Sequence, residues 1–161
     1  MNSRKPVVYI ANPSGFSDAG RLWLAEVVVP KLASAGFEVI NPFDQVMGKT
    51  NTELRNSMEA MSHNEAIGIG TDNFAKIDGS GFIFAILDGT DVDSGTSIEI
   101  GYGYASGKKV VGYRGDFRAT ADAGACKANL QVETAIELSG GHIHYDIGDA
   151  VAELERLALG Q

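Results

Sequence analysis

Apolar residues occur along this chain in short runs that alternate with longer amphipathic stretches. Runs rich in Val, Ile, Phe and Tyr predict short buried strands at residues 7–11, 37–40, 82–87, 109–113 and 142–145. Apolar residues at helical spacing predict helices over about 18–35, 65–77, 94–107, 129–138 and 149–159. The segment 41–62 is polar and weakly periodic, which predicts a loop followed by a short helix.

The order of these elements predicts the fold class. Strand, helix and strand in this rhythm imply right-handed parallel crossovers. We therefore predict one α/β domain over residues 1–161, with a parallel, flavodoxin- or Rossmann-like sheet of about five strands flanked by helices. Ligands bind such sheets at the carboxyl ends of the strands. Three polar loops fall there, at residues 12–18, 41–45 and 89–96, and their convergence predicts a ligand site.

The most informative loop holds Asp93 and leads into a helix that contains Glu99 between two isoleucines. Asp93 would lie just before the helix, and Glu99 one to two turns inside it, partly shielded from water. Two carboxyl groups at one crevice can divide the work of a nucleophile and a proton donor. Spacing alone still favours an ordinary solvated glutamate, so both interpretations stay open at this point.

Other local patterns are weaker. The glycines of residues 101–107 come late in the helix, which favours close helix packing over a dinucleotide-binding fingerprint. His142 and His144 would share a strand face, but a pair without a third ligand favours surface histidines over a metal site. Residues 94–97 could hold a phosphate or simply cap the helix. Residues 114–128 predict a long loop, with Arg114 and Arg118 in solvent, that could close over the site.

Composition narrows the classes of function. The net charge of −8 argues against binding to a nucleic-acid backbone, which needs clustered Lys and Arg. Cys126 is the single cysteine, so neither a disulfide framework nor a cysteine zinc site is expected. No apolar run approaches the roughly 20 residues that span a bilayer, and the polar opening residues do not look like a signal peptide. We therefore expect a cytoplasmic protein that binds no membrane.

One long segment resembles a known family. Asp93-Ser-Gly-Thr-Ser-Ile-Glu-Ile-Gly-Tyr-Gly-Tyr-Ala-Ser-Gly-Lys-Lys109 closely resembles the signature of the nucleoside 2-deoxyribosyltransferases. Segments 8–13, 39–44, 73–78 and 127–133 are similar to further parts of that family, in the same order. The resemblance implies transfer of the 2-deoxyribosyl group between nucleobases by double displacement, with 2'-deoxyribonucleosides and free nucleobases as partners and no metal or organic cofactor.

The resemblance also implies roles for individual residues. Glu99 matches the family's nucleophile, Asp93 the acid that protonates the departing base, and Tyr9 the tyrosine that orients the nucleophile. Asn129 matches an asparagine supplied by an adjacent protomer, which implies a homo-oligomer (a dimer or a trimer of dimers) with shared active sites. Asn73 occupies a position near the base where the family carries Asp or Asn. The full set of expected substrate-binding residues is Asn12, Phe16, Asp44, Asn73, Gly95 and Asn129.

Two other functions compete with this one. Related deoxynucleoside-5'-monophosphate N-glycosidases hydrolyse the same bond and hold the 5'-phosphate with a Ser- and Arg-containing first loop. Here Ser14 and Ser17 lie in that loop, whereas Arg21 falls on the predicted helix. A non-catalytic nucleoside-binding module is the third hypothesis. The sequence does not distinguish purine from pyrimidine substrates.

Overall fold

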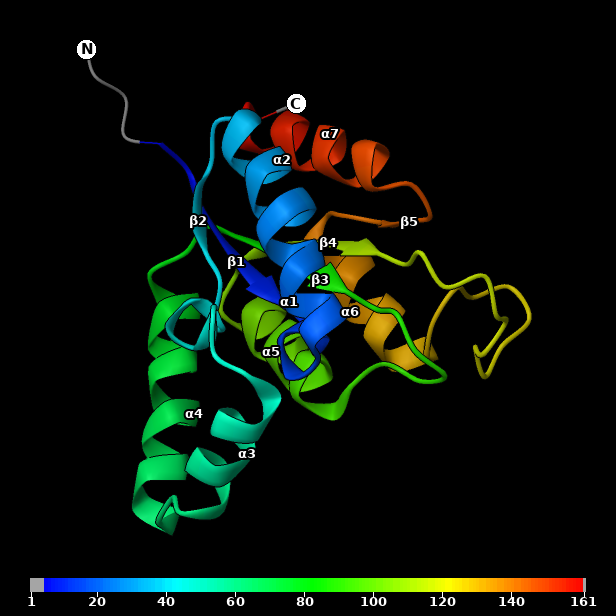
Figure 1. Ribbon diagram of the computed structural model, residues 1–161. Helices are drawn as coiled ribbons and strands as arrows, with labels where there is room; N and C mark the ends of the chain where they lie inside the picture. The colour runs from blue at the N-terminus through cyan, green and yellow to red at the C-terminus, as the bar shows by residue number, and fades with distance from the viewer. Residues whose placement is uncertain (1–4, 161) are drawn as a thin grey trace.

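The computed structural model describes residues 5–160, so most of the polar opening segment and the last residue of the expected domain lie outside the described residues. Five parallel strands form one sheet in the order β2-β1-β3-β4-β5 (Figure 1). The strands are β1 (Val7–Ala11), β2 (Glu38–Ile40), β3 (Phe82–Ile86), β4 (Lys109–Tyr113) and β5 (Ile143–His144). The predicted α/β class and parallel five-stranded sheet are confirmed.

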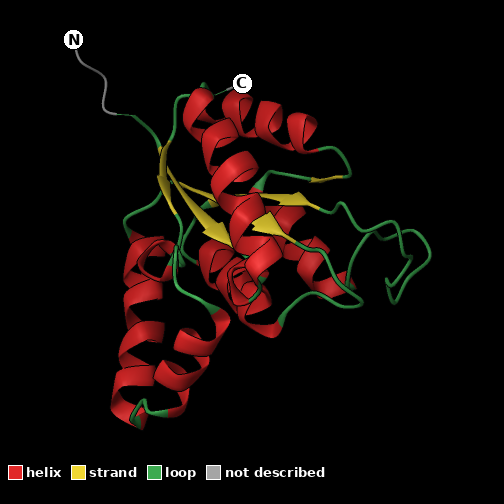
Figure 2. Cartoon of the chain, in the orientation of Figure 1, coloured by secondary structure: helices red, strands yellow, loops and turns green. Residues whose placement is uncertain are grey.

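Helices cover both faces of the sheet (Figure 2). Successive strand residues point to opposite faces, so Tyr9 and Ile83 join one core cluster while Val8 and Phe84 join the other. The Tyr9 face packs against α4 (His63–Asp78), α5 (Ser94–Ala105) and α6 (Leu130–Ser139). The Val8 face packs against α1 (Asp18–Trp23), α2 (Val29–Ser34) and α7 (Ile147–Ala158).

The first helical segment has the predicted extent and continues past Pro30 to Ser34. A π-helical stretch at Leu24–Val28 lies just before the proline, which has no N–H to donate to a carbonyl one turn earlier. The buried face of this segment is Leu24, Val28 and Leu32, whereas Leu22 is exposed.

A helical hairpin, α3 (Asn51–Glu59) and α4, extends from the body below the sheet in Figure 1. Both helices begin with a capping box, formed by Thr50 with Glu53 and by Ser62 with Glu65. The predicted short helix within 41–62 is therefore present. It follows a 3₁₀ turn at Asp44–Val46.

One charged residue assigned to solvent by the sequence, Arg114, is structural. Arg114 is 1% exposed, and its guanidinium donates to the carbonyl oxygens of Leu87, Gly89 and Arg118, which ties the loop after β4 to the loop after β3. His142 and His144 are hydrogen-bonded at 2.7 Å to the buried carboxylate of Glu153.

These contacts also decide the ionisation of Glu153. Burial acts to raise the pKa of the Glu153 carboxyl, but the hydrogen bonds from the two histidines outweigh it and leave that pKa below its usual value. Within residues 5–160, no cluster of His, Cys, Asp and Glu could hold a metal ion. None of the helices described is long and apolar enough to cross a membrane.

Close packing of α5 on the sheet explains one of the late glycines. A Cβ at Gly103 would collide with Cδ1 of the fully buried Ile83 on β3, whereas a Cβ at Gly101 would meet nothing within 4 Å. Ile83 pairs in register with Tyr9 of β1. Gly103 therefore allows α5 to approach the central strand β3 directly.

The same substitution at these two glycines should have opposite effects. Gly101→Ala should be neutral or stabilise the protein by up to about 1 kcal/mol, because Ala is the better helix former. Gly103→Ala should destabilise it relative to Gly101→Ala by about 1–3 kcal/mol, because Ile83 must shift inside a packed core. Urea unfolding of both variants measures the difference.

A third variant tests whether contact with Ile83 causes the loss of stability in Gly103→Ala. Ile83→Val deletes only the clashing Cδ1, so Gly103→Ala introduced into Ile83→Val should lose most of its penalty. Equal stability of the two alanine variants would show that α5 is not held against Ile83.

Candidate active site

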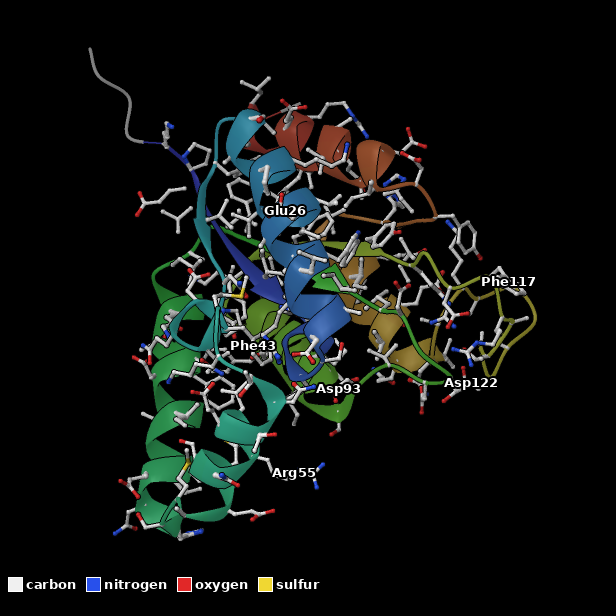
Figure 3. All side chains as sticks on the ribbon, in the orientation of Figure 1. Glu26, Phe43, Arg55, Asp93, Phe117 and Asp122 are labelled. Carbon is white, nitrogen blue, oxygen red and sulfur yellow. The ribbon has the colours of Figure 1, made fainter. Side chains whose placement is uncertain are left out.

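The predicted polar loops converge at one end of the sheet. Chain crossovers leave β1 and β3 in opposite directions, and ligand sites of parallel sheets lie at such switch points. A cavity of about 320 Å³ opens there. The labelled Phe43 and Asp93 lie at this end in Figure 3. The cavity is lined by Asn12, Phe16, Pro42, Phe43, Gln45, Val46, Met58, Ile69, Asp72, Asn73, Lys76, Asp93, Gly95, Thr96 and Glu99.

At the base of this cavity, the structure joins Tyr9 and Glu99. Tyr9 lies in β1 with its side chain fully buried, and its hydroxyl donates to Glu99 Oε1 of α5 at 2.6 Å. Burial and the neighbouring carboxylate raise the pKa of Tyr9 far above its usual value. The phenol therefore remains a hydrogen-bond donor at every physiological pH.

Glu99 has an unusual ionisation. Burial raises its pKa to about 7, aided by the negative charge of Asp93, while the hydrogen bond from Tyr9 acts in the lowering direction. Near neutral pH the Glu99 carboxyl is therefore poised between its protonated and ionised forms. A strongly shifted carboxyl in a cavity is typical of a functional site.

Asp93 lies at the N-terminus of α5 and caps it. Its Oδ2 accepts from the Thr96 amide at 2.9 Å and from the Thr96 hydroxyl at 3.3 Å. A Cβ at residue 95 would lie 3.1 Å from Asp93 Oδ2, so Gly95 leaves the room that this capping carboxylate occupies. The cap fixes the Asp93 carboxylate beside the same cavity that Glu99 lines.

Besides Gly95, three predicted binding residues line the walls. Asn12 forms a turn, donating to Ile10 O and accepting from the Ser14 amide, so it shapes the loop after β1. Phe16 packs edge-on against Phe43 with ring centroids 5.0 Å apart. Asn73 contributes from the facing helix α4.

Two predicted residues lie elsewhere. Asp44 is exposed and does not line the cavity, whereas its neighbour Gln45 does. Asn129 caps α6 through the Gln131 amide and lines a separate hollow of about 540 Å³ between α5 and α6. Its predicted place in an adjacent protomer's site stays a prediction.

The sequence analysis missed Asp72 and Lys76, which line the cavity and form an ion pair of 2.7 Å. Ile69, Asp72, Asn73 and Lys76 follow the spacing of one helical face. That spacing was visible in the sequence, but charged residues on a helix usually face solvent, so it did not indicate a cavity wall.

Comparisons with known proteins agree with this geometry. The family model described as nucleoside 2-deoxyribosyltransferase matches residues 8–145. No curated protein sequence matches the chain.

Among solved structures, three similar folds share about a fifth of their sequence with this chain. A conserved protein from Enterococcus faecalis V583 has a TM-score of 0.71 and 22% identity over 96% of this chain and 99% of its own. A 2-deoxyribosyltransferase from Leishmania mexicana has a TM-score of 0.68 and 20% identity, covering 94% and 97%. A CMP N-glycosidase from Clostridium botulinum has a TM-score of 0.50 and 20% identity, covering 96% and 99%.

The family model begins in β1, which carries Tyr9, and extends beyond α5, which carries Glu99, to the residue after β5. It therefore covers every strand that builds the cavity, and the chain belongs to the nucleoside 2-deoxyribosyltransferase family.

Proposed function

We propose that this protein transfers the 2-deoxyribosyl group from one nucleobase to another through a covalent ester on Glu99. The observation that carries the proposal is the 2.6 Å hydrogen bond from the buried Tyr9 to Glu99, which lines the same cavity as Asp93. A cavity of about 320 Å³ falls within the size range of small-molecule sites, roughly 300–1,000 Å³.

In the first half-reaction, the ionised Glu99 carboxylate attacks the anomeric carbon of the deoxynucleoside. A bond forms between that carbon and a Glu99 oxygen while the carbon–nitrogen bond breaks. The departing base keeps the electron pair of the broken bond and takes a proton from Asp93. General acid catalysis of this kind typically contributes about 10²–10⁴-fold.

The second half-reaction reverses the first with a different base. A ring nitrogen of the incoming base attacks the anomeric carbon, the Glu99 carboxylate leaves, and Asp93 takes the proton of that nitrogen. Deoxyribose lacks an electron-withdrawing 2'-hydroxyl, so its oxocarbenium-like transition state forms readily, and the adjacent carboxylate stabilises the positive charge.

The cavity favours a neutral nucleoside over a 5'-monophosphate. Its lining includes three carboxylates, Asp72, Asp93 and Glu99, against the cation of Lys76. Arg21 is buried, with its guanidinium bonded to Gly15 O and to Asn51 Oδ1, and the Ser17 hydroxyl caps α1. Of the side chains that could have held a 5'-phosphate, those of Arg21 and Ser17 are therefore engaged within the protein.

The surface around Asn129 supports the expected homo-oligomer with shared sites. Two exposed apolar side chains, Tyr104 of α5 and Leu138 of α6, line the same hollow as Asn129. Such a surface is typical of a protein–protein interface. A second copy of this chain docked there would bring Asn129 toward its partner's cavity.

Base exchange separates transfer from hydrolysis. Incubation of a 2'-deoxynucleoside with a different free base should give the new deoxynucleoside as the main product, because the incoming base competes with water for the ester. Chromatography of the products measures the ratio of new nucleoside to free deoxyribose. Glu99→Ala should abolish exchange and keep the folded far-ultraviolet spectrum.

Two results would count against transfer. Release of free sugar at a rate unaffected by the second base would identify a hydrolase. Unchanged turnover by Glu99→Ala would remove the covalent mechanism.

The rate of the first half-reaction should follow the ionisation of Glu99. Since the attacking form is the carboxylate, kcat/KM should fall about tenfold per pH unit below a midpoint near pH 7, whereas loss of the Asp93 proton produces the separate fall on the alkaline side. Tyr9→Phe removes the hydrogen bond that lowers the pKa of Glu99, so the midpoint should move above 7. A pH–rate profile of both proteins measures this shift.

Tyr113→Phe is the matched control, because Tyr113 lies in the other core cluster, beside Trp23 and Phe84. The midpoint of the pH–rate profile of Tyr113→Phe should equal that of the unmodified protein. A midpoint near pH 4–5 in the unmodified protein, or one that Tyr9→Phe does not move, would contradict the proposed role of this pair.

A further inference from the structure

One face of α4 forms a continuous wall of the cavity. Ile69, Asp72, Asn73 and Lys76 succeed one another at steps of three, one and three residues, which places them on a single helical face. The aromatic pair Phe16 and Phe43 lines the same cavity. A planar base can therefore lie between apolar surfaces while its edge meets the polar side chains of α4.

Lys76 is the one cationic side chain among the described residues that line this cavity. Its side chain is 27% exposed, whereas that of Asp72 is 59% exposed. The ion pair to Asp72 Oδ2, at 2.7 Å, holds the ammonium group in place. A lysine ammonium has three N–H donors, so this contact leaves donors for a ligand.

We propose that Lys76 selects nucleobases with an exocyclic carbonyl oxygen, such as 6-oxopurines and 4-oxopyrimidines, over their amino counterparts. This inference rests on the proposed deoxyribosyl transfer at the same site. The Lys76 ammonium donates a hydrogen bond to the exocyclic oxygen, and Asp72 positions the ammonium for it.

The contact with Lys76 would raise the rate because negative charge develops on the base as it leaves. When the carbon–nitrogen bond breaks, its electron pair stays with the base, and in an oxo base the negative charge spreads onto the exocyclic oxygen. A nearby ammonium stabilises that charge more in the transition state than in the bound nucleoside. An exocyclic amino group is a donor and offers Lys76 no comparable acceptor.

A purely structural role for Lys76 predicts something different. Lys76 lies in the last turn of α4 and pairs with a residue four positions earlier, and both features stabilise a helix. A lysine with only that role would affect all substrates alike, through the stability or position of the helix.

The test compares three donor nucleosides that differ in the substituent at purine C6: 2'-deoxyinosine (oxo, with a proton on N1), 2'-deoxyadenosine (amino) and purine 2'-deoxyriboside (hydrogen). In a double displacement, the kcat/KM of the donor reports the first half-reaction alone, whichever base accepts the sugar. Lys76→Met should lower kcat/KM for deoxyinosine by about 10- to 100-fold and change the other two by less than about 3-fold. Lys76→Arg should retain most of the oxo preference.

Lys31→Met is the matched control, since Lys31 lies in the last turn of α2 on the opposite face of the sheet. It should leave all three donors unchanged. Equal losses for the three donors in Lys76→Met, or no loss for any, would overturn the inference and leave the proposed transfer intact.

A binding experiment decides the question independently of turnover. Calorimetry in the Glu99→Gln protein should show tighter binding of deoxyinosine than of deoxyadenosine, and addition of Lys76→Met should abolish that difference. If the unmodified protein makes no new nucleoside, the proposed transfer fails, yet a binding preference that disappears with Lys76→Met still supports recognition by this residue. A preference that persists in Lys76→Met refutes it.

Discussion

The hydrogen bond from the buried Tyr9 to Glu99 is the interaction on which the candidate site depends. Folding places a carboxyl group where water is scarce, and the phenol is the hydrogen-bond donor that favours its ionised form. A carboxyl pKa raised from 4.5 to about 7 means that the folded protein binds the proton more tightly than the unfolded chain. The contribution of Glu99 to the stability of the folded protein therefore becomes unfavourable as pH rises from 4.5 to about 7, by at most about 3 kcal/mol. The fold tolerates a destabilising carboxylate at the proposed reactive centre.

The architecture makes that contact possible between residues 90 positions apart in the chain. Parallel pairing of β1 and β3 sets Tyr9 beside Ile83, and the missing side chain at Gly103 lets α5 lie directly on Ile83. Asp93 begins α5 as its cap, so the same helix carries both carboxyl groups at a fixed spacing. A change in the register of β1 against β3, or in the distance of α5 from the sheet, would separate Tyr9 from Glu99.

Much of this arrangement could be predicted from the sequence. Apolar runs identify the strands, and the convergence of three polar loops follows from the geometry of parallel sheets. The roles expected of Tyr9, Asp93 and Glu99 came from family resemblance, since spacing alone cannot tell a buried helix glutamate from a solvated one. The predicted loop 114–128 is present, but the burial of Arg114 depends on carbonyl groups of Leu87 and Gly89, which sequence patterns do not place beside it.

Other features depend on tertiary placement. Residues of α4 line the cavity only because the α3–α4 hairpin packs beside it. In the sequence alone, Lys76 therefore cannot be distinguished from a surface lysine in an ion pair. Gln45 rather than Asp44 lines the cavity because both lie in a tight 3₁₀ turn, where one residue changes the direction of the side chain by about 120°.

The measurement that tests the account most directly is the mass of the protein after rapid acid quenching with a deoxynucleoside and no acceptor base. The account predicts one added deoxyribosyl group, located on Glu99 of α5 and discharged by a free base. Turnover without this adduct, or the same adduct on Glu99→Gln, would contradict it.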